Sequence, residues 1–335
     1  MRGWVVTKYG RPLQQVDLPE PEVGDRDVLV EIRAAGVNVL DEKIRGGEFK
    51  PVLPYKPPFV LGHDLAGVVT RIGTDVTRFA VGDEVYGRPR DQRVGTFASR
   101  LAVHEDDLAR KPRSLSFVDA ASVPLVALTA WQALVQIADV QPGQRVLIHA
   151  GSGGVGAYAI QLAKHLGATV ATTAGAANHE WVRELGADRV IDYRRERFDA
   201  LLTDYDVVLD SQGDESVRRS LEILRPGGIV IGIAGPLDTD FARAQGLALP
   251  IRLAAWAMSW SAKRAARRLG VRYRFLFMRA DGAQLERIAA LIDDGVVRPV
   301  VERSYAFAEV PQALEHVAGG RTRGKVVVDL ADTER

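Results

Sequence analysis

The sequence contains no cysteine among its 335 residues. Disulfide bonds, thiolate nucleophiles and every metal site with cysteine ligands are therefore excluded. Net charge is also nearly absent, because 44 Lys and Arg residues face 43 Asp and Glu residues, for a formal charge of +1. This balance gives no general case for nucleic-acid binding.

Long apolar runs are scarce as well. The first residues lack the apolar core of a signal peptide, which predicts a cytoplasmic protein. The longest charge-free stretch, residues 120–138, includes Pro124 and several polar residues, so we interpret it as a buried passage from strand to helix rather than a membrane span. Apolar residues make up 47% of the chain and charged residues 26%, which is ordinary globular composition. At about 150 residues per domain, the length predicts two domains.

The pattern of residues changes along the chain. The first third contains short strand-like segments separated by Gly, Pro and Asp turn signals. Beyond residue 122, buried strands alternate with amphipathic helices, which predicts a parallel sheet covered by helices. From residue 299 the chain returns to β character around one short helix at 310–317. We therefore expect an α/β fold with a β-rich domain in two parts, 1–122 and 299–335, and a strand–helix domain at 123–298.

A glycine-rich loop follows the predicted strand at 145–150 and precedes a predicted helix. Its G-x-G-x-x-G pattern consists of Gly151, Ser152, Gly153, Gly154, Val155 and Gly156. The first glycine permits a tight turn, the second lets backbone approach a pyrophosphate, and the third allows close helix packing. The helix N-terminus adds free N–H groups. This context predicts dinucleotide binding, and the alternative is a glycine-rich turn without a ligand.

The residues after the second strand bear on the choice of dinucleotide. Sites for NAD usually place an acid about 20 residues after the loop, at the end of that strand. Here the strand ends near Thr173, and the first acid is Glu180. A 2′-phosphate would meet no carboxylate, which favours NADP(H). Phosphate contacts would come from Thr173, Asn178, Tyr193 or Arg194, although Tyr193 and Arg194 could equally do no more than end the third strand.

Several motifs together resemble those of the medium-chain dehydrogenase/reductase superfamily. They lie at residues 34–41, 59–69, 81–87, 95–98, 120–130, 185–193, 224–228 and 324–327, in addition to the glycine loop. Over nearly its whole length the chain resembles the zinc-independent, quinone oxidoreductase-like (zeta-crystallin-like) branch. The resemblance implies a Rossmann dinucleotide-binding domain inserted in a discontinuous, GroES-like catalytic domain.

His63 requires separate consideration, because zinc-dependent members of that superfamily use a histidine in the matching Gly-His-Glu motif as a ligand. A catalytic zinc needs three protein ligands. Asn38 stands where those relatives carry a ligand cysteine, and the four-cysteine structural zinc lobe is missing. We therefore predict no metal site and a hydrogen-bonding or packing role for His63. Without a Lewis acid, reduction of a carbonyl or alkene by NADPH is favoured over alcohol oxidation.

The resemblance also implies the residues around the nicotinamide, which would lie in the cleft between the domains. Asn38 and Thr129 would lie near its amide or ribose. The alternatives are that Asn38 caps a turn and that Thr129 begins a helix. Asn38 and Tyr55 are the candidate catalytic residues, with Tyr86 as a second candidate for the substrate pocket. Further cofactor contacts are expected from Ala234, Phe275, Phe277 and Lys325.

Residues 241–280 contain nine Lys or Arg residues and no acid, so the remainder of the chain carries a net charge of −8. Within this basic segment, one helical face begins with Leu249, Leu253, Trp256 and Trp260 and continues with cations from Lys263 onward. This separation along the axis argues against a helix lying flat in a membrane interface. We expect a helical lid or a dimer contact, with attachment to anionic lipid as the alternative.

The sequence thus predicts a zinc-free, NADPH-dependent oxidoreductase that transfers hydride to a quinone or an α,β-unsaturated carbonyl. A small molecule is the expected partner, without nucleic acid, and the family suggests a homodimer. Two alternatives remain open: an NADP-dependent reductase of aldehydes or ketones, and a non-catalytic NADPH-binding regulatory protein.

Overall fold

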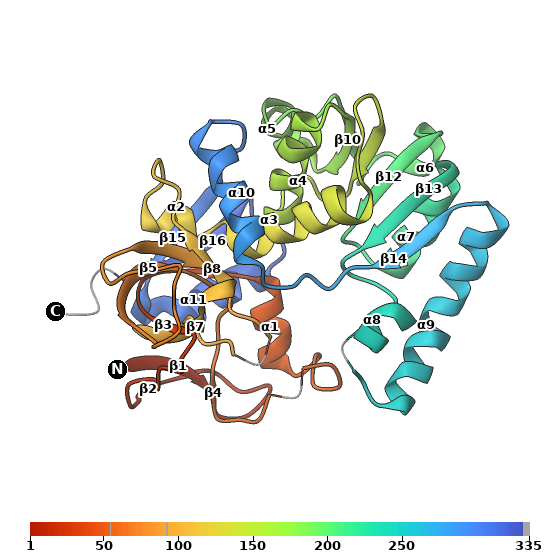
Figure 1. Cartoon of the computed structure of the whole chain (residues 1–335). Helices are drawn as coiled ribbons and strands as arrows, with labels where there is room; N and C mark the ends of the chain where they lie inside the picture. The colour runs from red at the N-terminus through yellow and green to blue at the C-terminus, as the bar shows by residue number, and fades with distance from the viewer. Residues whose placement is uncertain (54, 92, 245, 331–335) are drawn as a thin grey trace. The chain divides into compact units, whose positions relative to one another are not determined.

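The computed structural model describes residues 1–53, 55–91, 93–244 and 246–330, shown with the full chain in Figure 1. The chain divides into two compact units. Unit 1 comprises Met1–Leu128 and Arg279–Arg335, and unit 2 comprises Thr129–Met278. The mixed α/β class agrees with the sequence-based prediction.

Unit 1 is built on two sheets. The smaller has the strand order β2-β1-β4, and the larger has the order β15-β16-β3-β5-β6-β8, with β7 paired to β3. Strand β16 pairs antiparallel with β3, with Val326 opposite Val37. A strand from the C-terminal part of unit 1 thus lies within the sheet formed by its N-terminal part. The strands are β1 (Arg2–Val6), β2 (Gln14–Asp17), β3 (Asp27–Val37), β4 (Phe59–Val60), β5 (Asp64–Ile72), β6 (Glu84–Gly87), β7 (Arg100–His104), β8 (Leu108–Arg110), β15 (Val301–Ala306) and β16 (Lys325–Asp329).

Helix α10 (Gly282–Asp293) packs on β8 of unit 1. A Cβ at Gly282 would stand 2.2 Å from the carbonyl oxygen of Leu108, so only glycine permits this approach. The structure therefore divides the chain before α10, at 278/279, earlier than the predicted limit at 298/299. The other helices of unit 1 are α1 (Val39–Gly46), α2 (Phe117–Ala121), α11 (Val310–Ala318) and the short η1 (Glu105–Asp107) and η4 (Phe307–Glu309).

Unit 2 contains a parallel sheet with the order β11-β10-β9-β12-β13-β14. Counted from β9, this is the 3-2-1-4-5-6 order of the Rossmann fold, whose switch point lies between the first and fourth strands. The glycine loop follows β9 at that point. The strands are β9 (Arg145–Ile148), β10 (Thr169–Ala174), β11 (Arg189–Asp192), β12 (Tyr205–Asp210), β13 (Leu224–Gly232) and β14 (Arg272–Phe275).

Helices connect the strands of this sheet. They are α4 (Gly154–His165), η3 (Ala176–Asn178), α5 (His179–Glu184), α6 (Phe198–Leu201), α7 (Asp214–Glu222), α8 (Thr239–Ala244) and α9 (Leu249–Arg268). The buried Val, Ile and Leu residues of β12 and β13 match the near-continuous apolar strands expected of a sheet covered on both faces. Strand–helix alternation was thus correctly predicted.

The charge-free stretch at 120–138 differs from its prediction as a passage from strand to helix. It is mostly helical, from the end of α2 through a turn at residues 122–123 to α3 (Pro124–Trp131) and the π-helical segment η2 (Gln132–Ile137). A short apolar run fits a buried helix as well as a buried strand, so periodicity alone could not separate them. Within the described ranges, we find no helix that combines the length and apolarity needed to cross a membrane.

Candidate functional site

The glycines of the loop differ in the space beside them, where a side chain would stand. A Cβ at Gly151 would stand 2.1 Å from Oγ1 of Thr172, and one at Gly156 would stand 2.3 Å from the carbonyl oxygen of Ala150. At Gly153 the nearest atom would be the Ala150 oxygen, at 3.4 Å. Gly151 and Gly156 therefore allow neighbouring atoms to pack tightly within the turn, while the backbone of Gly153 remains open on the side where a Cβ would stand.

Gly153 is also the N-cap of α4, and the residues from Ser152 to Val155 are half-buried. The first N–H groups of a helix lack intrahelical partners, and the helix dipole favours an anion there. An open backbone at the start of α4 is therefore the surface that a pyrophosphate requires. The residues present fit a dinucleotide, as the spacing of Gly151, Ser152, Gly153, Gly154, Val155 and Gly156 predicts.

A buried chain of hydrogen bonds supports the loop from below. The backbone N–H of Ala150 donates to Oγ1 of Thr173 at 3.0 Å, and that oxygen lies 3.2 Å from Nδ1 of His149. On the other side of the ring, Nε2 lies 3.1 Å from Oγ of Ser220, which donates to Asp210 at 3.2 Å. Thr173 is thus placed to hold the loop, and the phosphate contact predicted for it stays a prediction.

The donors in this series of hydrogen bonds determine which nitrogen of His149 carries the proton. Because Thr173 accepts from Ala150, its own hydroxyl proton is available to Nδ1, which leaves the ring proton on Nε2 for Ser220. Burial lowers the pKa of His149, although Asp210 opposes this effect. A neutral ring is consistent with both observations. Sequence reasoning did not identify this network, because its members are scattered over 72 residues of sequence.

The end of β10 carries the groups relevant to a 2′-phosphate. A Cβ at Gly175 would stand 3.9 Å from Cζ of Arg194 and 3.9 Å from the ring of Tyr193. The Arg194 guanidinium lies over the Tyr193 ring at 5.5 Å, and both side chains are exposed. Asn178, at the end of η3, is half-buried beside the start of α5. Arg194 and Tyr193 thus project beside Gly175, where the predicted phosphate contacts are needed.

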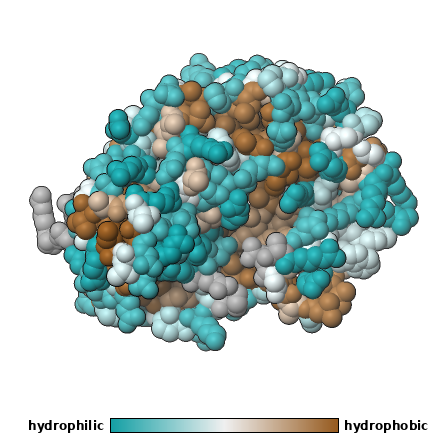
Figure 2. All heavy atoms as spheres, viewed as in Figure 1, coloured by the Kyte–Doolittle hydropathy of each residue, from teal (hydrophilic) through white to brown (hydrophobic). Residues whose placement is uncertain are grey.

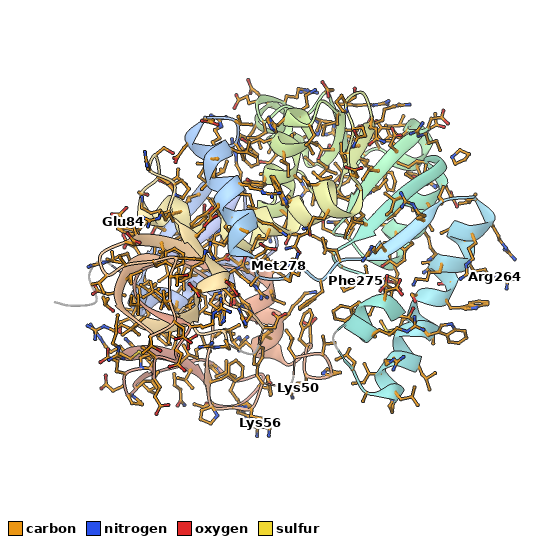
Figure 3. The ribbon with its side chains drawn as sticks, viewed as in Figure 1. Lys50, Lys56, Glu84, Arg264, Phe275 and Met278 are labelled. Carbon is orange, nitrogen blue, oxygen red and sulfur yellow. The ribbon has the colours of Figure 1, made fainter. Side chains whose placement is uncertain are left out.

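Three further predicted cofactor residues of unit 2 lie at or after the ends of β13 and β14. Phe275, labelled in Figure 3, ends β14. Its N–H donates to the buried Asp238 at 3.1 Å. The ring of Phe241 packs 5.4 Å from that of Phe275 and 5.3 Å from that of Phe277. Ala234 follows β13 and is half-buried. Asp238 therefore fixes the segment after β13 against β14.

Unit 1 contains a buried polar cluster centred on the ammonium of Lys325. It donates to the carbonyl oxygen of Val37 at 3.0 Å and to Oδ1 of Asn38 at 2.5 Å, and it lies 3.3 Å from Oδ2 of Asp64. Nδ2 of Asn38 donates to the same Asp64 oxygen at 2.9 Å, and the N–H of Leu125 donates to Oδ1 at 2.8 Å. Residues that are far apart in the sequence thus meet at one point.

Asn38 takes the capping role considered for it, while its place near the nicotinamide stays a prediction. It is the N-cap of α1, and its backbone N–H donates to Asp41 at 2.8 Å. Its side-chain amide contacts Lys325 and Asp64 instead of the helix. Burial raises the pKa of Asp64, while Lys325 and the amide of Asn38 oppose that rise.

Nδ1 of His63 is hydrogen-bonded to Oδ1 of Asp41 at a distance of 2.6 Å. Both side chains are buried. The hydrogen-bonding role predicted for His63 is therefore observed. Its Nε2 has no hydrogen-bond partner among the described residues. A zinc ion would need three ligand atoms, yet Asn38 and Asp64 face the Lys325 ammonium instead. This donor set does not fit a catalytic zinc, and no group of three His, Asp or Glu side chains in the described ranges is arranged to hold a metal.

Three predicted residues lie outside this cluster. Tyr55 is half-buried, with its ring 5.1 Å from that of Phe59. The hydroxyl of Tyr86 donates to the carbonyl oxygen of Leu285 at 2.7 Å, so Tyr86 is a packing residue between β6 and α10 rather than a substrate contact. Thr129 is buried within α3, which corrects the alternative that it begins a helix.

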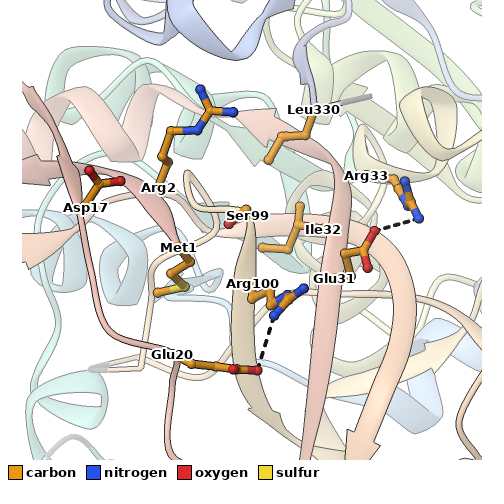
Figure 4. Close-up of a pocket in the computed structure, with 10 residues that line it drawn as sticks. All are labelled: Met1, Arg2, Asp17, Glu20, Glu31, Ile32, Arg33, Ser99, Arg100 and Leu330. Atoms are coloured by element: carbon orange, nitrogen blue, oxygen red, sulfur yellow. Dashed lines mark hydrogen bonds and ion pairs between the residues drawn. The ribbon is translucent and has the colours of Figure 1, made fainter. Parts of the chain in front are cut away.

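Figure 4 shows a pocket of about 350 Å³ on unit 1. Charged side chains line much of it, and two ion pairs join them, Arg33 with Glu31 and Arg100 with Glu20. Ligand sites are usually apolar with few polar groups. The pocket therefore does not compete with the glycine loop as a candidate site.

Comparisons with known proteins add the family context. The family model described as "Alcohol dehydrogenase GroES-like domain" matches residues 24–113, and the model described as "Zinc-binding dehydrogenase" matches residues 185–328. The chain is 34% identical to the mitochondrial NAD(P)H oxidoreductase RTN4IP1 of Danio rerio, over 100% of this chain and 92% of that protein. It is 32% identical to the chloroplastic NADPH-dependent alkenal/one oxidoreductase of Arabidopsis thaliana, over 98% of this chain and 79% of the relative.

Among solved structures, the chain is similar to the quinone oxidoreductase from Coxiella burnetii. The identity is 30% and the TM-score is 0.86, with 98% of this chain and 99% of that chain covered. Since the similarity extends over both units, it includes the parallel sheet of unit 2 and the discontinuous β-rich unit 1.

Proposed function

Since the chain belongs to the zinc-independent, quinone oxidoreductase-like branch of the medium-chain dehydrogenase/reductase superfamily, with a GroES-like unit 1 and a Rossmann unit 2, we propose that it reduces quinones or α,β-unsaturated carbonyls with NADPH. The observation that carries this proposal is the open backbone at Gly153, at the start of α4. The Lys325–Asn38–Asp64 cluster in unit 1 supports a reduction without a metal, because its donor set does not fit zinc.

The protein would act mainly by binding and orienting. The N–H groups at the start of α4 would hold the pyrophosphate, and Phe275, Phe277 and Ala234 would border the nicotinamide end, with Thr129 and Lys325 as further contacts. The cofactor, when bound, would supply a hydride for the electrophilic carbon of the acceptor. The resulting enolate or phenolate anion of the acceptor would then take one proton from solvent. Asn38, fixed by Lys325 and Asp64, would orient the reacting groups, and Tyr55 would contact the acceptor.

The preference for NADPH over NADH is supported by Arg194 and Tyr193. Both are exposed beside Gly175, and the Arg194 guanidinium lies over the Tyr193 ring. The carboxylate of Asp192 lies 3.9 Å from Nε of Arg195. Guanidinium groups bind phosphate through parallel N–H bonds. Arg194 is therefore available for a 2′-phosphate, with Tyr193 and Asn178 beside it.

The Arg194→Gln variant tests this preference. We expect KM for NADPH to rise about 10- to 100-fold, as loss of a charged hydrogen bond implies, while KM for NADH stays within about twofold. Arg195→Gln is the matched control, because Arg195 is the next residue and is exposed. Equal losses with both cofactors would contradict a role for Arg194 at the 2′-phosphate.

The acceptor is tested by stopped-flow oxidation of NADPH with a panel of quinones, enones and aldehydes. Turnover of quinones or enones supports the proposal, whereas turnover of aldehydes alone would support the carbonyl reductase alternative. NADPH binding without turnover of any acceptor would indicate a binding protein. Asn38→Ala and Tyr55→Ala should each lower kcat/KM, and unchanged rates would remove that residue from the mechanism.

The proposal includes a cytoplasmic homodimer. Strand β14 is an edge strand of the unit 2 sheet, so its free edge could pair with a second copy. Analytical ultracentrifugation tests the dimer, and a monomer at micromolar concentration would contradict it. Cell fractionation tests the proposed cytoplasmic location. The relatives named above are described as mitochondrial and chloroplastic.

A further inference from the structure

Helix α9 is attached to unit 2 through a face of small side chains. Its buried residues are Ala255, Ser259, Ala262 and Ala266, which recur once per turn of the helix. These residues bring α9 against α7, α8 and β14. The larger side chains of α9 consequently have to project elsewhere.

Large apolar side chains of α9 project into solvent. Leu249 is 64% exposed, Trp256 55% and Trp260 47%. Of the ten exposed large apolar residues in the described ranges, six lie between residues 249 and 269: Leu249, Leu253, Trp256, Met258, Trp260 and Leu269. Figure 2 shows apolar spheres at the lower right, where Figure 1 places the start of α9. We refer to Leu249, Leu253, Trp256 and Trp260 as the α9 apolar face. Its exposure does not support the expectation that these residues pack as a lid.

Cations continue this face toward the end of the helix. Arg264 lies on the outer side of α9 (Figure 3), with its guanidinium 5.1 Å from the ring of Trp260. Arg267 and Arg268 follow and are exposed. Arg264, Arg267 and Arg268 form a basic end beside the apolar end of α9, whereas Lys263 lies 3.9 Å from Asp238 and 3.6 Å from Asp240. Exposed apolar patches bordered by polar groups are typical of interaction surfaces.

We propose that α9 docks this protein on an anionic lipid surface, with the α9 apolar face entering the interface and Arg264, Arg267 and Arg268 at the level of the phosphates. The apolar end extends about 16 Å from Leu249 to Trp260, at about 1.5 Å per residue. A helix that is apolar at one end and basic at the other fits an oblique insertion rather than a flat position. Trp residues favour that interface, and cations are attracted to anionic lipid.

The charges favour a lipid surface over a second copy of the chain. A two-fold contact between two α9 helices would bring together two basic ends, each with Arg264, Arg267 and Arg268 exposed. Like charges placed side by side oppose association. An anionic surface neutralises the same cations, and the remainder of the chain outside 241–280, with a net charge of −8, adds no net attraction to that surface.

Vesicle flotation tests the proposal on the full-length protein. The vesicles contain phosphatidylcholine alone or with about 30% phosphatidylglycerol, in about 0.1 M or about 0.5 M NaCl. We expect at least about tenfold more protein on the phosphatidylglycerol vesicles at the lower salt, and a loss of most of this binding at the higher salt. Equal recovery on both vesicles, or none on either, would overturn the proposal.

Two sets of substitutions separate the apolar and the basic contributions. Leu253→Gln, Trp256→Gln and Trp260→Gln together should lower binding about tenfold, and Arg264→Gln, Arg267→Gln and Arg268→Gln together should lower it and remove its dependence on salt. The controls are Val81→Gln, at another exposed apolar residue, and the triple substitution of Lys8, Arg189 and Arg321 by Gln. Equal losses in the controls would contradict docking through α9.

A third measurement needs no substitution. Phosphatidylcholine brominated on its acyl chains, mixed with phosphatidylglycerol, should quench the tryptophan emission of the wild-type protein, because Trp256 and Trp260 would enter the interface. Unquenched emission at a lipid concentration that floats the protein would contradict insertion. A wild-type dimer that becomes monomeric in the Leu253/Trp256/Trp260 variant, without vesicle binding, would identify the second copy as the occupant.

Discussion

The buried ammonium of Lys325 joins segments that lie far apart in the sequence. It extends from β16 to the end of β3 at Val37, to the N-cap Asn38 of α1, and to Asp64 at the start of β5. Both Lys325 and Asp64 are buried. A buried ion pair contributes little in net terms while it is intact, but loss of one partner leaves an uncompensated charge.

Lys325→Met should therefore lower the free energy of unfolding of unit 1 by about 3–5 kcal/mol at pH 7. Urea unfolding measures this change. The double variant Lys325→Met with Asp64→Asn should recover most of the loss, because it removes the unpaired carboxylate. Failure of Asp64→Asn to rescue stability would show that the ammonium acts through Val37 and Asn38 instead.

The same variant should have a distinct pH dependence. Burial raises the pKa of Asp64, and removal of Lys325 raises this pKa further because the ammonium opposed the effect. The folded state then binds a proton that the unfolded state binds only near pH 4, so stability falls as pH rises through the raised pKa. We expect the deficit of Lys325→Met to shrink as pH falls from 7 to about 5 in urea titrations. A constant deficit would contradict an ionised Asp64.

His149 should produce the opposite dependence. Burial lowers its pKa in the folded protein, so the unfolded chain binds the extra proton first, near pH 6.5. The stability of unit 2 is then full above about pH 6.5 and declines as pH falls, by up to about 1.4 kcal/mol per pH unit. His149→Gln should be less stable at pH 7.5 and lack this decline. His165→Gln, at the exposed end of α4, is the control that should retain the wild-type dependence.

At the level of the element, the loop between β9 and α4 offers a matched pair of substitutions. Gly156→Ala places a Cβ 2.3 Å from the Ala150 oxygen and should destabilise unit 2, whereas Gly153→Ala meets no atom closer than 3.4 Å. Gly153→Ala should keep its melting temperature within about 2 °C and still weaken NADPH binding at least about tenfold, because its Cβ occupies the open side. Scanning calorimetry measures the melting temperature and isothermal titration calorimetry the affinity, and normal affinity of Gly153→Ala would place the pyrophosphate elsewhere.

Elements set by local pattern were predicted well. The strands from β9 to β13 are short apolar runs, and the glycine loop consists of six consecutive residues whose conformational needs are local. Elements whose character depends on a distant partner were not. Helix α10 belongs to unit 1 because Gly282 meets Leu108, a contact that no sequence window contains. Tyr86 was considered for the substrate pocket, but its hydroxyl donates a hydrogen bond to the carbonyl oxygen of Leu285 in α10.

The candidate site follows the same division. Gly153 and the absent acid after β10 could be identified from spacing, since both lie within one strand–helix–strand unit. The Lys325–Asp64 pair joins residues 261 positions apart, and the Asp41–His63 bond joins residues 22 apart. Only the antiparallel pairing of β16 with β3 brings Lys325 to Asn38. Sequence motifs marked these residues individually, without indicating that they meet.

At the scale of the whole molecule, unit 1 depends on a strand supplied by the end of the chain. Strand β16 lies between β15 and β3 in the larger sheet. Deletion of residues 321–335 should therefore unfold unit 1, while unit 2, whose strands all lie between Arg145 and Phe275, should retain its parallel sheet. Limited trypsin digestion with mass spectrometry should recover a resistant fragment near residues 129–278. Equal resistance of both units in the truncated protein would contradict this dependence.

The position of β16 also imposes an order of events during synthesis. A ribosome releases residues 129–278 before it reaches Lys325, so unit 2 can fold while the first 128 residues still lack their central partner strand. During that interval the edge of β3 that later pairs with β16 is open to other strands, including those of neighbouring nascent chains. The nascent protein would thus complete unit 2 first, and chaperones would act mainly on the strands of unit 1 that wait for β16.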